Sequence, residues 1–153
     1  MSTEPSAETQ PVSPPRPQPN ELTQFFWDGL AEGELRIQRC QACGKYIHYP
    51  KPTCRFCQST DLAGERVSGR ATLYSWTIAV QAFHPFWIER LPYTIGTVEL
   101  AEQPGLMFAS QIVDCDEDSL RAGMPLEVVF EQLTKELTVP FFRPTMSKGE
   151  GAQ

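Results

Sequence analysis

The chain has 153 residues, of which 41% are hydrophobic, and its formal net charge is −6. This length provides one domain and a small appendage with a modest apolar core. No apolar stretch approaches the roughly 20 residues that a membrane-spanning helix needs, so we expect no membrane span. The acidic net charge argues against nucleic acid as a partner, because phosphate contacts require basic residues.

The first segment, residues 1–19, is dominated by proline among Ser, Thr, Gln and Glu. This composition lacks the apolar side chains that offset the entropy lost on ordering, so we predict a disordered tail. Residues 1–30 contain no charged region followed by an apolar run. Nothing in them indicates export, and we expect a cytoplasmic protein.

Residues 20–35 are predicted to be the segment of the N-terminal helix, which runs from its N-cap Asn20 through about Glu32, with Gly33 as its C-terminal stop. Its apolar residues share one face: Leu22, Phe25, Phe26, Trp27 and Leu30. Two interpretations of this face stay open, since the helix can pack on its own domain or dock on a partner. Phe26 and Trp27 are therefore candidate contact residues for a partner or an acyl-CoA.

Four cysteines within residues 36–66 form the most informative motif of the chain. They are arranged as two C-x2-C pairs separated by ten residues: Cys40, Cys43, Cys54 and Cys57. Two such pairs bring four sulfurs into the tetrahedral arrangement that zinc prefers, and Gly44 gives the first turn its backbone freedom. The alternative, two disulfides, suits a secreted domain. We predict a rubredoxin-like zinc ribbon with a structural Zn²⁺, because four thiolates leave no open position for catalysis.

Two further residues are candidates for additional chemistry: His48, which lies between the cysteine pairs, and Cys115, the fifth cysteine of the chain. His48 lies in a predicted short strand, residues 46–49, between the cysteine pairs. Because four cysteines already complete the metal site, we interpret His48 as a strand residue with a satisfied imidazole. Cys115 stands among acidic residues, which raise the pKa of a thiol, so we interpret it as structural or incidental.

Residues 67–145 change to a periodicity of two and are rich in β-branched and aromatic residues, which predicts strands. Five strands are expected, at residues 69–78, 93–100, 106–113, 126–130 and 137–141. A helical turn is expected at residues 118–123, between the third and fourth strands. This pattern predicts a five-stranded OB-fold barrel, so the fold class is mainly β. Residues 146–153 are predicted to be a flexible tail.

Basic residues gather in and beside the predicted ribbon. Residues 36–70 contain seven basic residues and two acidic ones, so this surface is locally positive. Even after the negative charge of a zinc with four thiolates is counted, it suits a small phosphorylated ligand better than a polynucleotide. Two alternatives stay open: a solvated ribbon surface, and an OB-fold protein that binds single-stranded nucleic acid.

An aromatic segment, residues 83–88, lies between the first two predicted barrel strands, where a loop is expected. So much aromatic surface is either folded over the barrel or covered by a base, an acyl chain or a partner protein. The acidic charge of the chain favours the acyl chain and the partner. Phe86 and Trp87 are therefore candidate contact residues.

Several short motifs accompany the cysteine pairs within residues 20–145. They are Ser68-Gly69-Arg70, Leu73-Tyr74-Ser75-Trp76-Thr77, Pro92-Tyr93, Glu99-Leu100, Gly123-Met124-Pro125 and Pro140-Phe141-Phe142-Arg143-Pro144. In combination with the cysteines they resemble the zinc-ribbon/OB-fold proteins of the "domain of unknown function 35" family, which are described as acyl-CoA-associated. Members of that family typically act beside thiolase-fold enzymes, as small subunits of archaeal acetoacetyl-CoA thiolase/HMG-CoA synthase assemblies, of benzoylsuccinyl-CoA thiolase and of steroid side-chain aldolases.

The resemblance implies an accessory subunit that binds a thiolase-fold partner in a hetero-oligomer and helps hold its acyl-CoA substrate. It implies zinc ligand roles for the four cysteines, and it adds Arg70, Trp76 and Arg143 as candidate contacts for acyl-CoA or the partner. The sequence contains no Ser/His/Asp set, no paired acid and base and no phosphate loop, so we assign the chemistry to the partner. A nucleic-acid-binding protein and an independent enzyme are the competing hypotheses.

Overall fold

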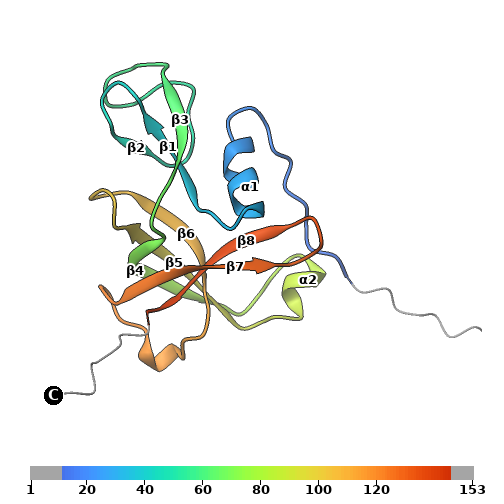
Figure 1. The fold of residues 1–153 in the computed structure, drawn as a ribbon. Coiled ribbons are helices and arrows are strands. Elements are labelled where there is room, and N and C mark those ends of the chain that lie inside the picture. The colour runs from blue at the N-terminus through green and yellow to red at the C-terminus, as the bar shows by residue number, and fades with distance from the viewer. Residues whose placement is uncertain (1–11, 146–153) are drawn as a thin grey trace, which may run out of the picture.

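A helix, a three-stranded sheet and a closed five-stranded barrel follow one another in the computed structural model, which describes residues 12–145 (Figure 1). The predicted fold class, mainly β with an N-terminal helix, a ribbon and an OB-fold barrel, is therefore confirmed. In chain order the elements are α1 (Gln24–Ala31), β1 (Arg36–Cys40), β2 (Tyr46–Ile47), β3 (Leu62–Arg66), β4 (Arg70–Ala79), α2 (Pro85–Ile88), β5 (Tyr93–Leu100), β6 (Met107–Ile112), η1 (Glu117–Ser119), β7 (Pro125–Gln132) and β8 (Thr138–Pro144).

Helix α1 begins later than the sequence predicts. Its N-cap residue is Thr23, not Asn20. The Asn20 side chain instead accepts hydrogen bonds from two backbone N–H groups, at 2.9 and 3.1 Å, and so stabilises the turn before the helix, as asparagine commonly does. The predicted C-terminus is confirmed: Gly33 has a φ of 77°, and the Glu34 N–H donates to the Gly29 carbonyl at 2.8 Å, closing a left-handed glycine cap.

Helix α1 packs on its own chain, against β1, β3 and β8. The contact with β3 is close, because a Cβ atom on Gly64 would lie 2.2 Å from the Phe25 ring. Phe26 reaches the barrel, with its ring centroid 6.1 Å from that of Phe108. Of the two interpretations of the apolar helix face, the structure therefore supports packing on its own domain.

The ribbon sheet has the strand order β2-β1-β3, with both pairings antiparallel. Strand β2 contains only Tyr46 and Ile47, which is shorter than the predicted strand of residues 46–49. The chain leaves the sheet after Ile47, and the ring of His48 stacks on Phe108 of the barrel, with 4.7 Å between ring centroids. Strand β3, which pairs with all of β1, was not predicted.

The barrel closes in the order β4-β5-β6-β8-β7, and the pairing of β6 with β8 is parallel. Its strands correspond to the five predicted ones. The predicted helical turn between the third and fourth strands is present, but it is a 3₁₀ turn at Glu117–Ser119, shorter than the predicted residues 118–123 and beginning one residue earlier. Gly123 has a φ of 83° and its N–H donates to the Leu73 carbonyl at 2.7 Å, which ties this segment to β4 instead of continuing a helix.

The aromatic segment between β4 and β5 contains a short helix, α2, where the sequence predicts a loop. His84 precedes it and its Nδ1 accepts a hydrogen bond from the Phe86 N–H at 3.2 Å, while Pro85 occupies the first helical position. Phe86 is buried. The segment is thus partly folded over the barrel, in agreement with one of the two interpretations of its aromatic surface.

One apolar core joins the root of the ribbon to the barrel. Its buried residues include Leu35, Ile37, Tyr46 and Val67 from the ribbon side, and Leu73, Val98, Leu126 and Phe142 from the barrel. The tip of the ribbon has a separate and much smaller cluster, Cys40, Ile47 and Cys54, with Leu62 packed against it. In Figure 1 the tip stands away from the barrel, with α1 beside the ribbon.

The predicted tails lie partly or wholly outside the described residues: 1–11 of the first tail and 146–153 of the second. Residues 12–19 contain no helix or strand; Pro14 within them is buried, and Arg16 lies 3.6 Å from Glu136. The division of the chain at residues 19, 35, 66 and 145 stays a prediction. Within residues 12–145, every helix is too short or too polar to span a membrane.

Candidate functional site

The four predicted zinc ligands meet at the tip of the ribbon. All four Sγ atoms lie within 4.8 Å of one another, with 3.6 Å between Cys40 and Cys57 and 3.7 Å between Cys43 and Cys54. A tetrahedral zinc with Zn–S bonds of about 2.3 Å requires sulfurs about 3.8 Å apart, so this donor set fits the metal. A disulfide requires about 2.0 Å, and all four cysteines are free thiols.

Backbone N–H groups around the sulfurs favour the thiolates that a metal needs. The Cys43 N–H donates to Cys40 Sγ at 3.5 Å and lowers the pKa of the Cys40 thiol to about 6. Burial raises the pKa of Cys54, but the N–H groups of Cys57 and Phe56 outweigh it, and the pKa is lowered. Against a backbone hydrogen bond that lowers it, the neighbouring sulfurs raise the pKa of Cys57 to about 12, so this cysteine has to lose its proton when a metal binds. Because four thiolates fill a tetrahedron, the site is structural.

Ion pairs remove part of the positive charge that the sequence places on the ribbon. Arg36 pairs with Glu32 and Glu34, Arg39 pairs with Glu65, and Arg66 lies 3.8 Å from Glu34. Within residues 12–145, the remaining four basic residues of this region have no ion pair: Lys45, Lys51, Arg55 and Arg70. Lys45 and Arg55 lie over the ring of Phe56, 5.9 and 4.7 Å from its centroid. Two of these four unpaired cations, Lys45 and Arg55, therefore lie at the ribbon tip, while Arg70 begins strand β4 of the barrel.

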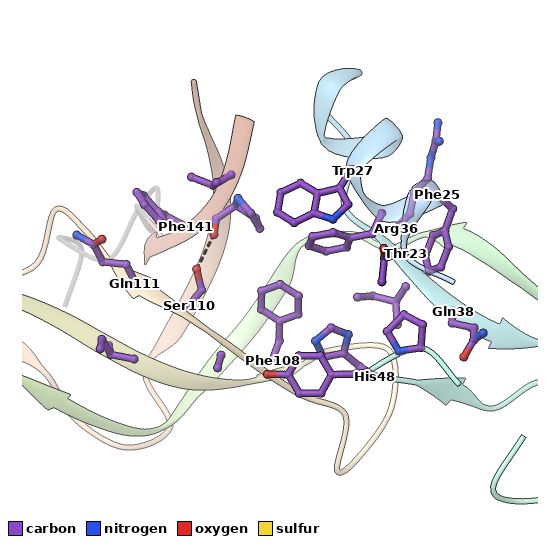
Figure 2. A pocket seen from close by; sticks show the side chains of 18 of the residues that line it. Thr23, Phe25, Trp27, Arg36, Gln38, His48, Phe108, Ser110, Gln111 and Phe141 are labelled. Atoms are coloured by element: carbon purple, nitrogen blue, oxygen red, sulfur yellow. Dashed lines mark hydrogen bonds between the residues drawn. The ribbon is translucent and has the colours of Figure 1, made fainter. Parts of the chain in front are cut away.

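An apolar pocket of about 490 Å³ lies where α1, the ribbon root and the barrel meet (Figure 2). Segments from residue 23 to residue 141 contribute to its walls. Its aromatic lining includes Phe26, Trp27, His48, Trp87, Phe108 and Phe141. In Figure 2, Phe108 and His48 lie on one side of this space and Trp27 on the other.

His48 faces this pocket and is not the satisfied strand residue that the sequence analysis predicts. Burial lowers the pKa of its imidazole to about 4, so the ring is neutral at pH 7. In the described part of the chain, residues 12–145, neither imidazole nitrogen has a hydrogen-bond partner. A neutral imidazole offers one donor and one acceptor, and here both are available to a ligand.

Three of the predicted contact residues come together at the pocket: Phe26, Trp27 and Trp87. Phe86 lies behind Trp87, in an edge-to-face contact with ring centroids 4.9 Å apart, and carries the Arg90 guanidinium 4.4 Å from its centroid. Phe86 therefore supports the position of Trp87.

The other three predicted contact residues lie away from the pocket. Arg70 and Arg143 occupy strand positions on either side of Glu127, and Arg143 donates to that carboxylate at 2.9 Å. Arg70 also lines a different cavity, of about 510 Å³. Trp76 lies on β4 opposite Gly96 and is 39% exposed.

Sequence reasoning missed His48, Phe108 and Phe141 as pocket residues. The two phenylalanines lie in predicted strands, where alternation marks them as core. That alternation does not reveal that the core opens beside helix α1, which lies far earlier in the chain. The one available signal was a lone histidine surrounded by aromatic residues in the sequence Tyr46-Ile47-His48-Tyr49.

Comparison with known proteins places both parts of the chain in one group. Residues 27–63 match the family model described as the rubredoxin-like zinc ribbon domain of ChsH2, and residues 64–131 match the ChsH2 C-terminal OB-fold domain. The chain is 31% identical over 103 residues to a DUF35 domain-containing scaffold protein of Methanothermobacter thermautotrophicus, an alignment that covers 67% of this chain and 75% of that protein.

A longer relative and a solved structure extend the likeness. The chain is 33% identical over 136 residues to a probable enoyl-CoA hydratase alpha subunit of Thermomonospora curvata; the alignment covers 89% of this chain but 41% of that protein, so the chain spans less than half of its length. It is also similar to a chain of a structure titled "Ltp2-ChsH2(DUF35) aldolase", with a TM-score of 0.77 and 33% identity, covering 84% of this chain and 98% of that one.

Proposed function

Because this chain belongs to the DUF35 family of zinc-ribbon/OB-fold proteins, we propose that it is a non-catalytic accessory subunit of an acyl-CoA-processing complex. Its partner is a thiolase-fold enzyme, and the complex carries out thiolase or retro-aldol chemistry. The observation that carries this proposal is the likeness over 98% of a chain in the Ltp2-ChsH2(DUF35) aldolase. The ribbon zinc stabilises the subunit and does not contact substrate.

The surroundings of the nucleophilic and titratable side chains support a non-catalytic role. Nδ1 of His84 is occupied by the Phe86 N–H, and His48 has no carboxylate partner within residues 12–145. Burial raises the pKa of the Cys115 thiol, which disfavours the reactive thiolate. In the same range, the one cluster of His, Cys, Asp and Glu with metal-binding geometry is the zinc site. A catalytic base held by a second group is therefore missing from the described residues.

The surface of the chain offers groups for both ends of an acyl-CoA. The unpaired cations at the ribbon tip, Lys45 and Arg55, suit the CoA phosphates, because exposed ammonium and guanidinium groups bind phosphate through charge-assisted hydrogen bonds. The aromatic residues Phe26, Trp27 and Trp87 suit the acyl portion. Arg70, Trp76 and Arg143 remain candidate contacts with the partner, since they lie on other faces of the barrel.

Affinity purification of the tagged full chain from its native cells, with mass spectrometry at moderate salt, tests this function. We expect a thiolase-fold protein in stoichiometric amount. The Cys40→Ser/Cys43→Ser variant provides the matched control, because a partner that recognises the folded ribbon should be lost from it. Recovery of the chain alone, or turnover of an acyl-CoA by the isolated chain, would contradict the proposal.

A second candidate function is membership of a hydratase complex, which the similarity to the probable enoyl-CoA hydratase alpha subunit favours. The same purification separates the two candidates, since a hydratase subunit in place of a thiolase-fold protein selects the second. Recovery of nucleic acid, with binding that weakens steeply as salt is raised, selects the OB-fold nucleic-acid-binding alternative instead.

A further inference from the structure

Strand β4 pairs with a neighbour on both sides only in its first half. There β7 pairs with Arg70–Thr72 on one side, while β5 runs along the other side. The next residue, Leu73, still has its N–H and its carbonyl bonded on the β7 side, to Met124 and Gly123. Beyond Leu73, β4 stays paired with β5, but within residues 12–145 no strand pairs with its other side. We call this side, along residues 74–79, the open edge of β4.

The strand pairing shows which backbone groups face the open edge. The Leu100 N–H donates to the Leu106 carbonyl on the β6 side, so alternate residues of β5 counted back from Leu100, Gly96 among them, direct their backbone groups toward β6. Trp76 lies opposite Gly96 and therefore directs its own N–H and carbonyl away from β5. Ile78, two residues later, does the same. These four groups face the open edge.

The open edge lacks the charged residues and prolines that usually keep an edge strand from pairing with another chain. Residues 71–88 contain no Asp, Glu, Lys or Arg, and β4 contains no proline. The irregularity of β4 between Leu73 and Ser75 precedes most of the edge. Four consecutive residues, 74–77, are exposed, so both faces of the strand reach solvent here. Such an edge can accept another strand.

The gap between β6 and β8 shows what a protected edge looks like in the same barrel. These two strands pair at one position, Ile112 with Phe142. Beyond it, Pro140 of β8 has no N–H to offer, and its carbonyl accepts a hydrogen bond from the Ser110 hydroxyl of β6. At this residue β8 is closed to a further strand, whereas the edge of β4 is open along several residues.

The open edge is complementary to itself. If two copies pair antiparallel about a two-fold axis through Thr77, Trp76 of each copy lies opposite Ile78 of the other, and each such pair exchanges two hydrogen bonds. This register gives a partner to all the edge-facing groups of Trp76 and Ile78 in both copies. The facing side chains are tryptophan with isoleucine and threonine with threonine, which are pairs that stabilise a sheet.

Charge restricts where two copies of this chain can meet. Each copy carries a net charge of −6, so most of their surfaces repel one another. Residues 71–88 are the longest stretch of the sequence without an Asp, Glu, Lys or Arg, and the open edge lies within them. At the axis, where every residue of one copy approaches the same strand of the other, no like charges oppose each other.

We propose that two copies of this chain associate through the open edges of β4, with the two-fold axis at Thr77, and so form one continuous sheet across both barrels. The proposal goes beyond the proposed function and does not depend on it. It assigns Trp76, which lies away from the apolar pocket, a contact in the second copy.

Sedimentation equilibrium of the purified, zinc-loaded full chain tests the association. We expect a monomer–dimer equilibrium that shifts toward the dimer as the concentration is raised. Thr77→Lys places two like charges at the axis and should weaken dimer formation by about tenfold. Thr72→Lys is the matched control, because Thr72 is also exposed but lies where β4 is paired on both sides. This control should dimerise as the wild type does, and both variants should keep their zinc.

A disulfide across the axis tests the register. Facing residues that share no backbone hydrogen bonds in an antiparallel pair have Cα atoms about 4.5 Å apart, which a disulfide can bridge. Thr77→Cys in a Cys115→Ser background should therefore form a covalent dimer under mild oxidation, because zinc protects the other four cysteines. Thr72→Cys in the same background should stay monomeric on a non-reducing gel.

Three results would overturn the proposal. A chain that sediments as a monomer at every concentration has no such interface. A dimer that Thr77→Lys leaves unchanged, or that Thr77→Cys does not cross-link, forms through another surface. If the free chain is a monomer and Thr77→Lys prevents recovery of the partner, the edge receives a strand of the partner and not of a second copy. Recovery of a thiolase-fold partner by a monomeric chain leaves the proposed function standing, while a dimer without that partner rejects the proposed function alone.

Discussion

The barrel and the ribbon tip are stabilised in different ways, although they belong to one short chain. The barrel is closed and surrounds large buried side chains such as Phe142, Leu73 and Leu126. The ribbon tip buries only Cys40, Ile47 and Cys54, with Leu62 beside them. So small a cluster cannot offset the entropy of ordering the two cysteine turns, so the metal must supply the difference. The tip is therefore a metal-dependent unit attached to a barrel that does not need the metal.

The pocket lies at the junction of these two units and takes its walls from both. His48 follows β2 of the ribbon, while Phe108 belongs to β6 of the barrel, and their rings are in contact. Loss of order in either unit would separate the two rings. The pocket is therefore expected to be more sensitive to damage than either unit alone.

The largest expected effect follows from removing the metal. Cys40→Ser/Cys43→Ser should abolish zinc binding and unfold the ribbon tip, because structural zinc contributes on the order of 10–16 kcal/mol at pH 7 in zinc-finger peptides. The variant should be insoluble or unable to bind its partner. Zinc content and amide hydrogen exchange check this, with loss of protection in β2 and β3 and retained protection in β5. Cys115→Ser is the control, because Cys115 lies outside the zinc cluster and its replacement should leave zinc bound. A zinc-free variant whose ribbon amides stay protected from exchange would show that the ribbon tip does not depend on the metal.

A cavity in the barrel core should lower the stability of the protein without removing the zinc. Phe142 is fully buried and its ring lies 5.9 Å from that of Phe108, so Phe142→Ala should lower the free energy of unfolding by about 3–5 kcal/mol. Urea unfolding measures the loss, and the zinc content of each folded molecule should stay unchanged. The control is Phe83→Ala, because Phe83 is 95% exposed and its removal should change stability by less than about 0.5 kcal/mol. Loss of zinc from Phe142→Ala would show that the two units are not independent.

The junction should lose stability in acid through His48. Its pKa is about 4 in the folded chain and 6.5 as the ordinary value, so between these values the unfolded chain binds more protons. Stability is thus complete above pH 6.5 and falls by about 3 kcal/mol as the pH drops to 4. Urea unfolding across this range should show a steeper loss in the wild type than in His48→Phe. Protonation of the zinc thiolates affects the wild type and His48→Phe equally, so it drops out of the difference between them. If the free energy of unfolding changes with pH equally in both proteins, His48 is not buried as a neutral ring.

The elements that the sequence predicts correctly are those whose signal is local. The cysteine pairs determine the ribbon because all four ligands lie within 18 residues, and the period of two marks the barrel strands because each has one buried face. Strand β3 was missed because its sequence, Leu-Ala-Gly-Glu-Arg, lacks β-branched and aromatic residues; its pairing with β1 makes it a strand. The small Gly64 within it is explained only by the ring of Phe25.

In the candidate site, too, the parts with a local sequence signal were predicted and the parts without one were not. The zinc ligands were predicted from spacing alone, whereas the pocket was not, since its walls come from segments between residues 23 and 141. Three aromatic residues chosen for their exposure, Phe26, Trp27 and Trp87, do line it. His48 was assigned the wrong environment, because no local pattern reveals that the chain leaves the ribbon sheet to place this ring on Phe108.

The smallest predicted effect tests the connection between the two units. The side-chain amide of Gln103, in the turn between β5 and β6, makes two hydrogen bonds with the backbone of Tyr46 in β2: its oxygen accepts from the N–H at 2.8 Å and its nitrogen donates to the carbonyl at 3.1 Å. Gln103→Ala should lower the free energy of unfolding by about 2 kcal/mol, since each bond contributes about 0.5–1.5 kcal/mol. Urea unfolding measures this loss, with Gln81→Ala, at an exposed glutamine in the segment before α2, as the control.

Gln103→Glu separates the two bonds of this connection. A carboxylate still accepts from the Tyr46 N–H but cannot donate to its carbonyl, so Gln103→Glu should lower the free energy of unfolding by about 1 kcal/mol, less than Gln103→Ala, because one of the two bonds remains. Zinc should stay bound in both variants, because the Gln103 side chain bonds to the backbone of Tyr46 and to none of the four cysteines. Amide exchange in β2 should become faster than in β5. Exchange that remains equal in β2 and β5 would mean that the apolar core alone joins the ribbon to the barrel, and that Tyr46, buried in that core, holds the two units together without the amide.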